Sequence, residues 1–172
     1  YHNLVRLVSR AHLEGFYYKP RIDKKSLAEF SEGLICLSGC INGEINQHIQ
    51  GGQIDHARKS LEDFLGIYGK DHFFLELHDH GMEAQQRCNE QLLQFADDYG
   101  LRTVVANDVH FLNKSDHEAH DVMICIGTGA RVIDENRMHY SDEVYFKTGT
   151  EMRNLFSHLP EACDATLEIA ER

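Results

Sequence analysis

The stretch FFLELHDHGMEAQQRCNEQLLQFADDYGLRTVVA, residues 73–106, decides the fold class. Residues 73–79 are rich in apolar and β-forming types, which predicts a buried strand ending near Gly81. Residues 83–99 carry a helical pattern that Gly100 ends. Residues 103–106 then form another apolar strand. Strand, helix and strand in this order predict a parallel βα unit.

The same alternation extends in both directions along the chain. The apolar run 33–38, ending at Gly39, has the form of a buried parallel strand, and residues 144–147 predict a short strand. We expect helices at 3–13, 24–31, 44–50, 54–68 (closed by Gly69), 116–127 (capped by Ser115), 150–159 (capped by Thr150) and from Pro160 onward. The fold class is therefore α/β, with parallel strands and flanking helices.

Composition limits the class of protein. The 172 residues amount to one domain, and 42% hydrophobic with 26% charged residues argues against disorder or a coiled coil. No apolar run reaches the ~18 residues of a membrane span, and no leader is visible. With 17 Lys and Arg against 28 Asp and Glu, the net charge of -11 argues against a duplex-DNA surface, although a small phosphate pocket remains compatible.

The ends and the cysteines carry two further expectations. The chain opens without Met in a running helical pattern and stops in an uncapped one, so we expect a piece of a longer protein. Five cysteines at irregular spacing, with no CxxC pair, favour reduced thiols in a cytoplasmic setting over disulfides or a zinc ribbon. Neither a Walker loop nor a G-x-G-x-x-G motif is present.

Asp108 and His110 lie two residues apart, just after the strand 103–106. In an extended chain they would point to the same side, at the carboxyl end of a strand, where barrels of βα units place their active sites. An oxygen and a nitrogen ligand suit zinc or manganese. The alternative is a surface carboxylate beside a capping histidine.

Other polar residues follow the first two predicted strands. Cys40 comes just after the first strand, where a thiolate could bind metal, although a buried inert cysteine is the more common case. Glu76, His78 and His80 would share one face of the second strand by alternation. They could bind metal, but supporting hydrogen bonds to the ligands are the favoured interpretation.

Two more groups have open alternatives. Lys19 and Arg21 flank Pro20 and, with Tyr17 and Tyr18, could grip a phosphate or form a solvated loop. His117 and His120 lie three residues apart on one predicted helix, so they share a face. They could form a metal pair, but a solvated helix face is the favoured interpretation.

Several segments together resemble a known family. The chain is similar to the later part of the PHP (polymerase and histidinol phosphatase) domain found in the family of bacterial DNA polymerase III alpha subunits, the C-family replicative polymerases. The resemblance covers nearly all 172 residues and rests on these segments: FYYKPRID (16–23), LSGC (37–40), EL-x-DHG (76–81), ANDVH (106–110), LPEA (159–162) and EIA (168–170).

The resemblance implies a fold and a site. It implies part of a distorted (β/α)7 PHP barrel without its N-terminal strands, spanning 1–172, with about 144–172 leading toward the polymerase palm. It places Cys40, Asp108 and His110 at metal-ligand positions of a cluster of ions at the strand ends. Lys19 and Arg21 would then neutralise substrate phosphate. The residues expected to orient the ligands are Glu76, His80 and Asn107.

The resemblance also implies an activity. The intact chain would be a DNA-directed DNA polymerase using magnesium, with a zinc or manganese PHP site of the phosphoesterase type capable of 3′–5′ exonuclease proofreading. The alternatives are a non-catalytic scaffold that docks the separate proofreading subunit, and a histidinol-phosphatase-like enzyme. Implied partners are DNA and other polymerase III holoenzyme subunits, with no membrane. The family's opening His-x-His motif is missing, so we expect this stretch alone to be inactive, with partial or no metal.

Overall fold

Three parallel strands form the sheet at the centre of the computed structural model, which describes residues 1–172. Their order is β1 (Cys36–Leu37), β2 (Phe73–Leu77) and β3 (Arg102–Val105). In the register, Cys36 lies opposite Phe73 and Leu77 opposite Val105. Parallel neighbours need a crossover connection, and helices supply it between each pair of strands.

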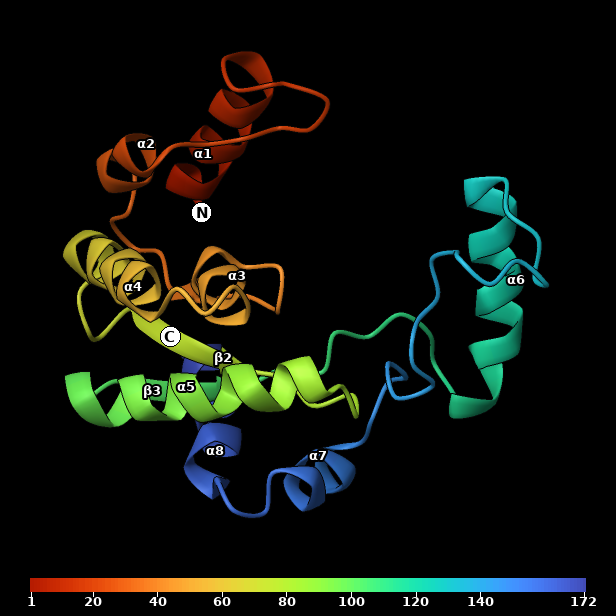
Figure 1. The fold of residues 1–172 in the computed structure, drawn as a ribbon. Coiled ribbons are helices and arrows are strands. Elements are labelled where there is room, and N and C mark those ends of the chain that lie inside the picture. The colour runs from red at the N-terminus through yellow and green to blue at the C-terminus, as the bar shows by residue number, and fades with distance from the viewer.

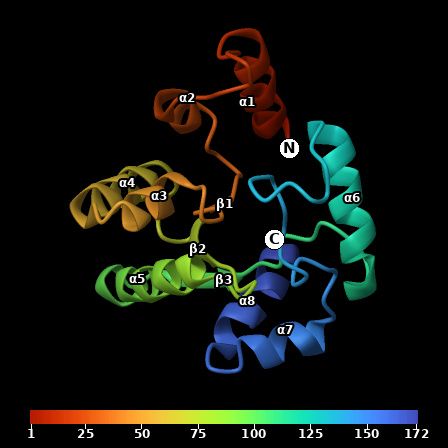
Figure 2. The same ribbon diagram turned by 45° about the vertical axis from the view of Figure 1, so that its right-hand side comes forward.

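The helices lie around these strands (Figure 1, Figure 2). Both views place α3 and α4 together on one side of β2, and α7 and α8 together on another. In Figure 1, α6 stands apart at the far right. The helices are α1 (His2–Leu13), α2 (Lys24–Glu29), α3 (Glu44–Gln50), α4 (Ile54–Tyr68), α5 (Glu83–Tyr99), α6 (His117–Thr128), α7 (Gly149–Leu155) and α8 (Pro160–Ala170), with a 3-10 turn η1 (Lys114–Asp116) before α6.

The core forms where β2 meets the helices. Phe73, Leu75 and Leu77 of β2 are completely buried, as are Leu92 and Phe95 of α5. Apolar residues of α4 and α8 join the same cluster. A strand buried on both faces explains why residues 73–77 are almost continuously apolar. The predicted α/β class, with parallel strands and flanking helices, is therefore confirmed, whereas the expected membership of a partial (β/α)7 barrel stays a prediction, since the sheet has three strands.

The first strand is shorter and less buried than the sequence predicts. The prediction covered 33–38, but β1 contains only Cys36 and Leu37, and Leu37 is 39% exposed. Gly33 has a φ of 73°, which lies outside the β region. At the edge of the sheet, β1 has only β2 to pair with, so its apolar run does not mark a central strand.

Two other strand boundaries also differ from those predicted by the sequence. β2 ends at Leu77, two residues before the predicted end. Residues 144–147 form a single parallel bridge, between Phe111 and Tyr145, instead of a strand. The Lys147 amide donates back to the Tyr145 carbonyl at 2.9 Å, so the backbone turns away from the ladder after one bridge.

Two predicted helix caps are wrong: the N-cap of α6 is Asp116, one residue after Ser115, and the N-cap of α7 is Thr148, two residues before Thr150. Ser115 lies inside η1, and Asn113 forms a capping box with Asp116. Thr150 lies inside α7, whose cap is Thr148: its hydroxyl accepts from the Glu151 amide at 3.2 Å. Asn113, which caps η1, and Thr148, which caps α7, each precede an acidic residue by three positions, which is the capping-box pattern.

Two findings complete the description. No helix combines the length and the apolar character that crossing a bilayer requires. All five cysteines are free thiols, and Cys88, Cys125 and Cys163 are buried.

Candidate metal and phosphate site

A pocket of about 370 Å³ lies where the carboxyl ends of the three strands meet. The turn after each strand contributes to its wall: Cys40 follows β1, His80 follows β2, and Asp108 follows β3. The segment 139–144 closes another side. Because parallel strands end at a common edge, residues far apart in sequence reach one cavity.

Cys40 and Asp108, predicted from separate strands, therefore line the same pocket. His110 is not among its lining residues, but its Nε2 lies 3.4 Å from Asp108 Oδ1. The His110 ring packs on Tyr140, with centroids 4.1 Å apart, and Tyr140 does line the pocket. The thiol, the carboxylate and the imidazole thus belong to one region.

The backbone between Asp108 and His110 differs from the prediction. Asp108 has a φ of 48°, so the segment is not extended, and alternation along a strand does not bring the two side chains together. They meet through a left-handed turn, a conformation that Asp tolerates better than most residues. The spacing predicted the pair, but for the wrong geometric reason.

The donor types suit a divalent metal, although the chain does not assemble a full ligand set. Sulfur, carboxylate oxygen and imidazole nitrogen are the ligands of zinc, and the latter two also suit manganese. No group of three or more His, Cys, Asp and Glu side chains is arranged to hold a metal ion. Cys40, Asp108 and His110 therefore do not form a complete metal-binding group, and their role as ligands stays a prediction.

His80 is fixed by hydrogen bonds at both ring nitrogens. Its Nε2 lies 2.6 Å from the Asn107 carbonyl, which can only accept, so the proton belongs on Nε2. Its Nδ1 then accepts from Gln85 Nε2 at 2.8 Å. Burial lowers the pKa of His80, which favours this neutral form. His80 thereby holds the peptide carbonyl immediately before Asp108.

Gln85 is the most important site residue that the sequence prediction missed. Its Oε1 accepts from the His80 backbone amide at 2.8 Å, so one amide side chain satisfies two groups of His80. Gln85 is buried and lies on the same face of α5 as Cys88, Leu92 and Phe95. A polar amide at the core positions of a helix was the signal that could have revealed it.

Glu76 supports the turn that presents Cys40. Glu76 Oε2 accepts from the Gly39 amide at 3.1 Å, and the Glu76 amide donates to Ser38 Oγ at 2.8 Å. Glu76 Oε1 lies 2.9 Å from Nε2 of the buried His78, whose Nδ1 has no partner. The expected common face of Glu76, His78 and His80 breaks after His78, because β2 ends at Leu77 and His80 turns to Asn107.

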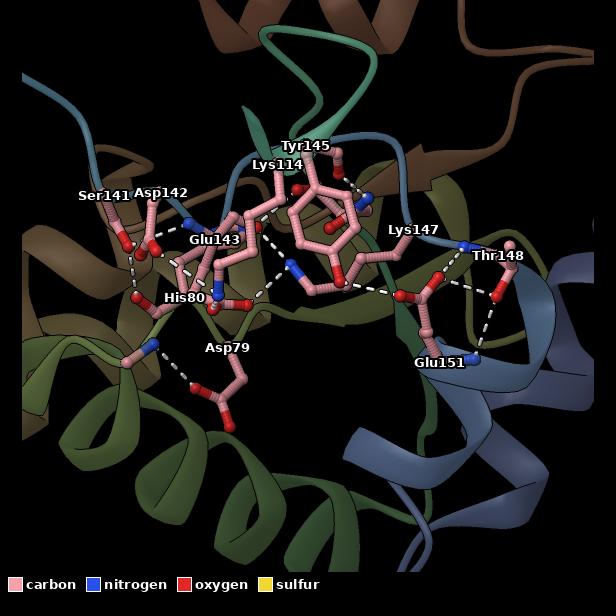
Figure 3. A network of polar contacts seen from close by, with 12 residues as sticks. Asp79, His80, Lys114, Ser141, Asp142, Glu143, Tyr145, Lys147, Thr148 and Glu151 are labelled. Carbon is pink, nitrogen blue, oxygen red and sulfur yellow. Dashed lines mark hydrogen bonds and ion pairs between the residues drawn. The ribbon is translucent and has the colours of Figure 1, made fainter. Parts of the chain in front are cut away.

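A polar network holds the segment 139–144 in place (Figure 3). Ser141 Oγ donates to the His80 carbonyl at 3.1 Å. Lys147, only 8% exposed, donates to the Glu143 carbonyl and lies 3.3 Å from the Glu143 carboxylate. A hydrogen bond from Lys114 is the main reason that the pKa of Glu143 is lowered. The network therefore connects the pocket wall to the start of α7.

The remaining predicted residues lie elsewhere. Lys19 and Arg21 belong to the loop between α1 and α2, and neither lines the pocket of Cys40 and Asp108. His117 and His120 were expected on a solvated face, but both are half-buried. His117 Nε2 lies 2.9 Å from the Tyr140 carbonyl, and the His120 ring packs beside Phe111. These contacts contradict the solvated interpretation.

The chain is similar in sequence to a known domain family and to several known proteins. Residues 1–80 match the model of the PHP domain family. The chain is 44% identical to the DNA polymerase III subunit alpha of Borreliella burgdorferi, over 100% of this chain and 15% of that protein. It is 46% identical to the subunit of Thermus aquaticus, over 99% of this chain and 14% of that protein. The Treponema pallidum subunit is 39% identical, again over 100% of this chain and 15% of its own length.

The chain thus spans about 15% of the length of these curated relatives. The likeness continues beyond residue 80, so the helices after the matched PHP region are part of it. These findings show that residues 1–80 belong to the PHP domain family and that the whole chain is similar to one segment of DNA polymerase III alpha subunits.

Proposed function

We propose that this chain is the PHP segment of a replicative DNA polymerase and that, in the longer protein, its pocket hydrolyses a phosphodiester at the 3′ end of DNA. The observation that carries the proposal is the joint presence of Cys40 and Asp108 on one pocket at the strand ends. His110, 3.4 Å from Asp108, adds the third donor. The relatives' name, DNA polymerase III subunit alpha, supports DNA and the other holoenzyme subunits as partners.

A divalent ion bound here would lower the pKa of a water and balance the charge of the phosphate. The protein side chains have distinct tasks in this proposal. Cys40, Asp108 and His110 hold the ion, with the remaining ligands coming from the longer protein. His80 and Gln85 fix the backbone beside Asp108, and Glu76 fixes the turn before Cys40. Lys19 and Arg21 contribute positive charge toward substrate phosphate.

The test is the paired substitution Asp108→Ala with His110→Ala in the full-length subunit. We expect loss of bound zinc or manganese and loss of 3′–5′ exonuclease activity, measured by metal analysis and by shortening of a labelled oligonucleotide. The matched control is Asp55→Ala with His56→Ala, which removes the same two side-chain types from an exposed part of α4. Unchanged metal content and nuclease activity in the Asp108 and His110 variant would refute the assignment.

A second function is favoured by one observation: no three donor side chains are gathered into a ready ligand group. The segment would then serve as a scaffold that stabilises the polymerase and docks the proofreading subunit, with any metal acting through stability. Chelation separates the two functions. Loss of thermal stability on chelation, in a protein that shows no nuclease activity before it, supports the scaffold.

A further inference from the structure

The loop between α1 and α2 exposes three consecutive aromatic rings. Phe16 is 60% exposed, Tyr17 62% and Tyr18 83%. Isolated exposed apolar residues are ordinary on protein surfaces, but a run of adjacent rings indicates a contact surface. Neither the proposed pocket nor the core uses these rings.

The loop holds Tyr18 outward in a defined geometry. The Tyr17 amide donates to the Lys19 carbonyl at 3.1 Å, which closes a tight turn with Tyr18 at its tip. Tyr18 has a φ of 59°, a left-handed conformation that is unfavourable for a residue with a large side chain. Its ring meets the Tyr17 ring edge to face, with centroids 4.6 Å apart. Strain of this kind concentrates at binding sites.

The charge of the loop differs from that of the rest of the chain. The molecule carries a net charge of -11, yet neither Lys19 nor Arg21 forms an ion pair with a carboxylate of the chain. The Arg21 guanidinium instead lies over the Tyr17 ring, 5.0 Å from its centroid. Two cations beside exposed rings, neither of them paired with a carboxylate, are complementary to an external anion that also has flat faces.

The location fits the proposed substrate. Figure 1 shows the loop extending to the right of α1, toward the side at which β2 ends. The pocket lies at the strand ends on that side. The loop and the pocket therefore lie toward the same side in that view.

We propose that this loop binds single-stranded DNA, with Tyr18 and Phe16 stacking on bases and with Lys19 and Arg21 contacting phosphates. Stacking accepts any base, so the binding is independent of sequence. Single strands are favoured over duplex, because paired bases do not offer free faces and the molecule as a whole is acidic. This inference rests on the proposed function for its substrate class.

The experiment uses the full-length subunit and a single-stranded oligodeoxythymidylate that carries 5-iodouracil near its 3′ end. Irradiation links the iodinated base to an aromatic ring stacked on it, and mass spectrometry locates the link. We expect crosslinked peptides containing residues 16–18. Tyr18→Ala should remove most of this crosslink, whereas Tyr18→Trp should retain it. Alanine meets the same backbone restriction as tyrosine at this φ, so the turn itself is not relieved.

Leu13→Ala is the matched control, because Leu13 is 84% exposed beside the same loop but has no ring. If the subunit is a nuclease, Tyr18→Ala should raise the oligonucleotide KM by about tenfold.

The two proposals can fail separately. A crosslink at residues 16–18 in a subunit without nuclease activity supports the DNA-binding loop and removes the proposed hydrolysis. The loop proposal is overturned if residues 16–18 never crosslink while other regions do. It is also overturned if Tyr18→Ala crosslinks at residues 16–18 to the same extent as the unchanged protein. Coverage of these rings by a protein partner, and not by DNA, would overturn it too.

Discussion

Gln85→Leu should loosen the backbone on which Asp108 is placed. Gln85 accepts from the His80 amide and donates to the His80 ring, both at 2.8 Å. Leucine has a similar size but leaves both His80 groups buried without a partner. Each unsatisfied buried group costs about 1–3 kcal/mol, so with two such groups the local opening free energy should fall by about 2–6 kcal/mol.

Hydrogen exchange followed by mass spectrometry measures this opening in the full-length subunit. A fall of about 2–6 kcal/mol corresponds to about 30- to 20,000-fold faster exchange, since about 1.4 kcal/mol is tenfold. The informative peptides cover 73–79 and 102–107. They exclude the His80 amide, which loses its own acceptor, and they include Ala106, whose amide donates to the Leu77 carbonyl at 3.0 Å.

The neighbouring Gln86 provides the control. It is exposed on the same helix, so Gln86→Leu changes the same chemical groups without touching His80. We expect exchange in this variant to match the unchanged protein within about threefold, because surface substitutions usually stay within about 0.5 kcal/mol. Equal exchange in the Gln85 and Gln86 variants would show that the amide does not support the pocket.

Three further predictions concern the core, a helix cap and the loop before the pocket wall. Phe95 is fully buried against β2, so Phe95→Ala should lower the free energy of urea unfolding by about 3–5 kcal/mol, while Leu167→Ala at an exposed position should change it little. Hydrogen bonds from Thr148 lower the pKa of Glu151 from 4.5 to about 2. Its stabilising effect is present above pH 4.5 and is lost as the pH falls toward 2, so the Tm difference between the unchanged protein and Glu151→Ala should shrink over that range. An undiminished difference at pH 2 would contradict this. Arg137 binds Asp121 with two hydrogen bonds of 2.6 and 2.7 Å, so Arg137→Gln should speed hydrogen exchange across 129–140 and leave 54–68 unchanged.

The local sequence pattern was sufficient to predict structure where the signals lie within a single helix. The helices 44–50, 54–68 and 83–99 lie where periodicity and terminal glycines predicted them. Such signals depend on neighbours within one or two turns, so they can be read directly from the chain. The run 33–38 misled for the opposite reason, because strand pairing depends on groups distant along the chain: only Cys36 and Leu37 pair with β2, and Gly33 lies outside the β region.

The candidate site likewise has features that are visible in the sequence and features that are not. Residue types and spacing made Cys40, Asp108 and His110 metal-ligand candidates with open alternatives, the family resemblance implied that all three are ligands, and this role stays a prediction. The left-handed turn at Asp108, the tautomer of His80 and the role of Gln85 were not visible in the sequence. Each depends on groups that are distant along the chain and meet only when β2, β3 and α5 pack together.

By itself the sequence determined the parallel α/β class and most of the helices, because periodicity and residue type are local properties. Only the tertiary structure decided that Cys40 and Asp108 share a pocket while Lys19 and Arg21 lie on a separate loop. The physical reason is that strand ends converge at one edge of a parallel sheet, and which side chains line that edge depends on packing across the whole molecule.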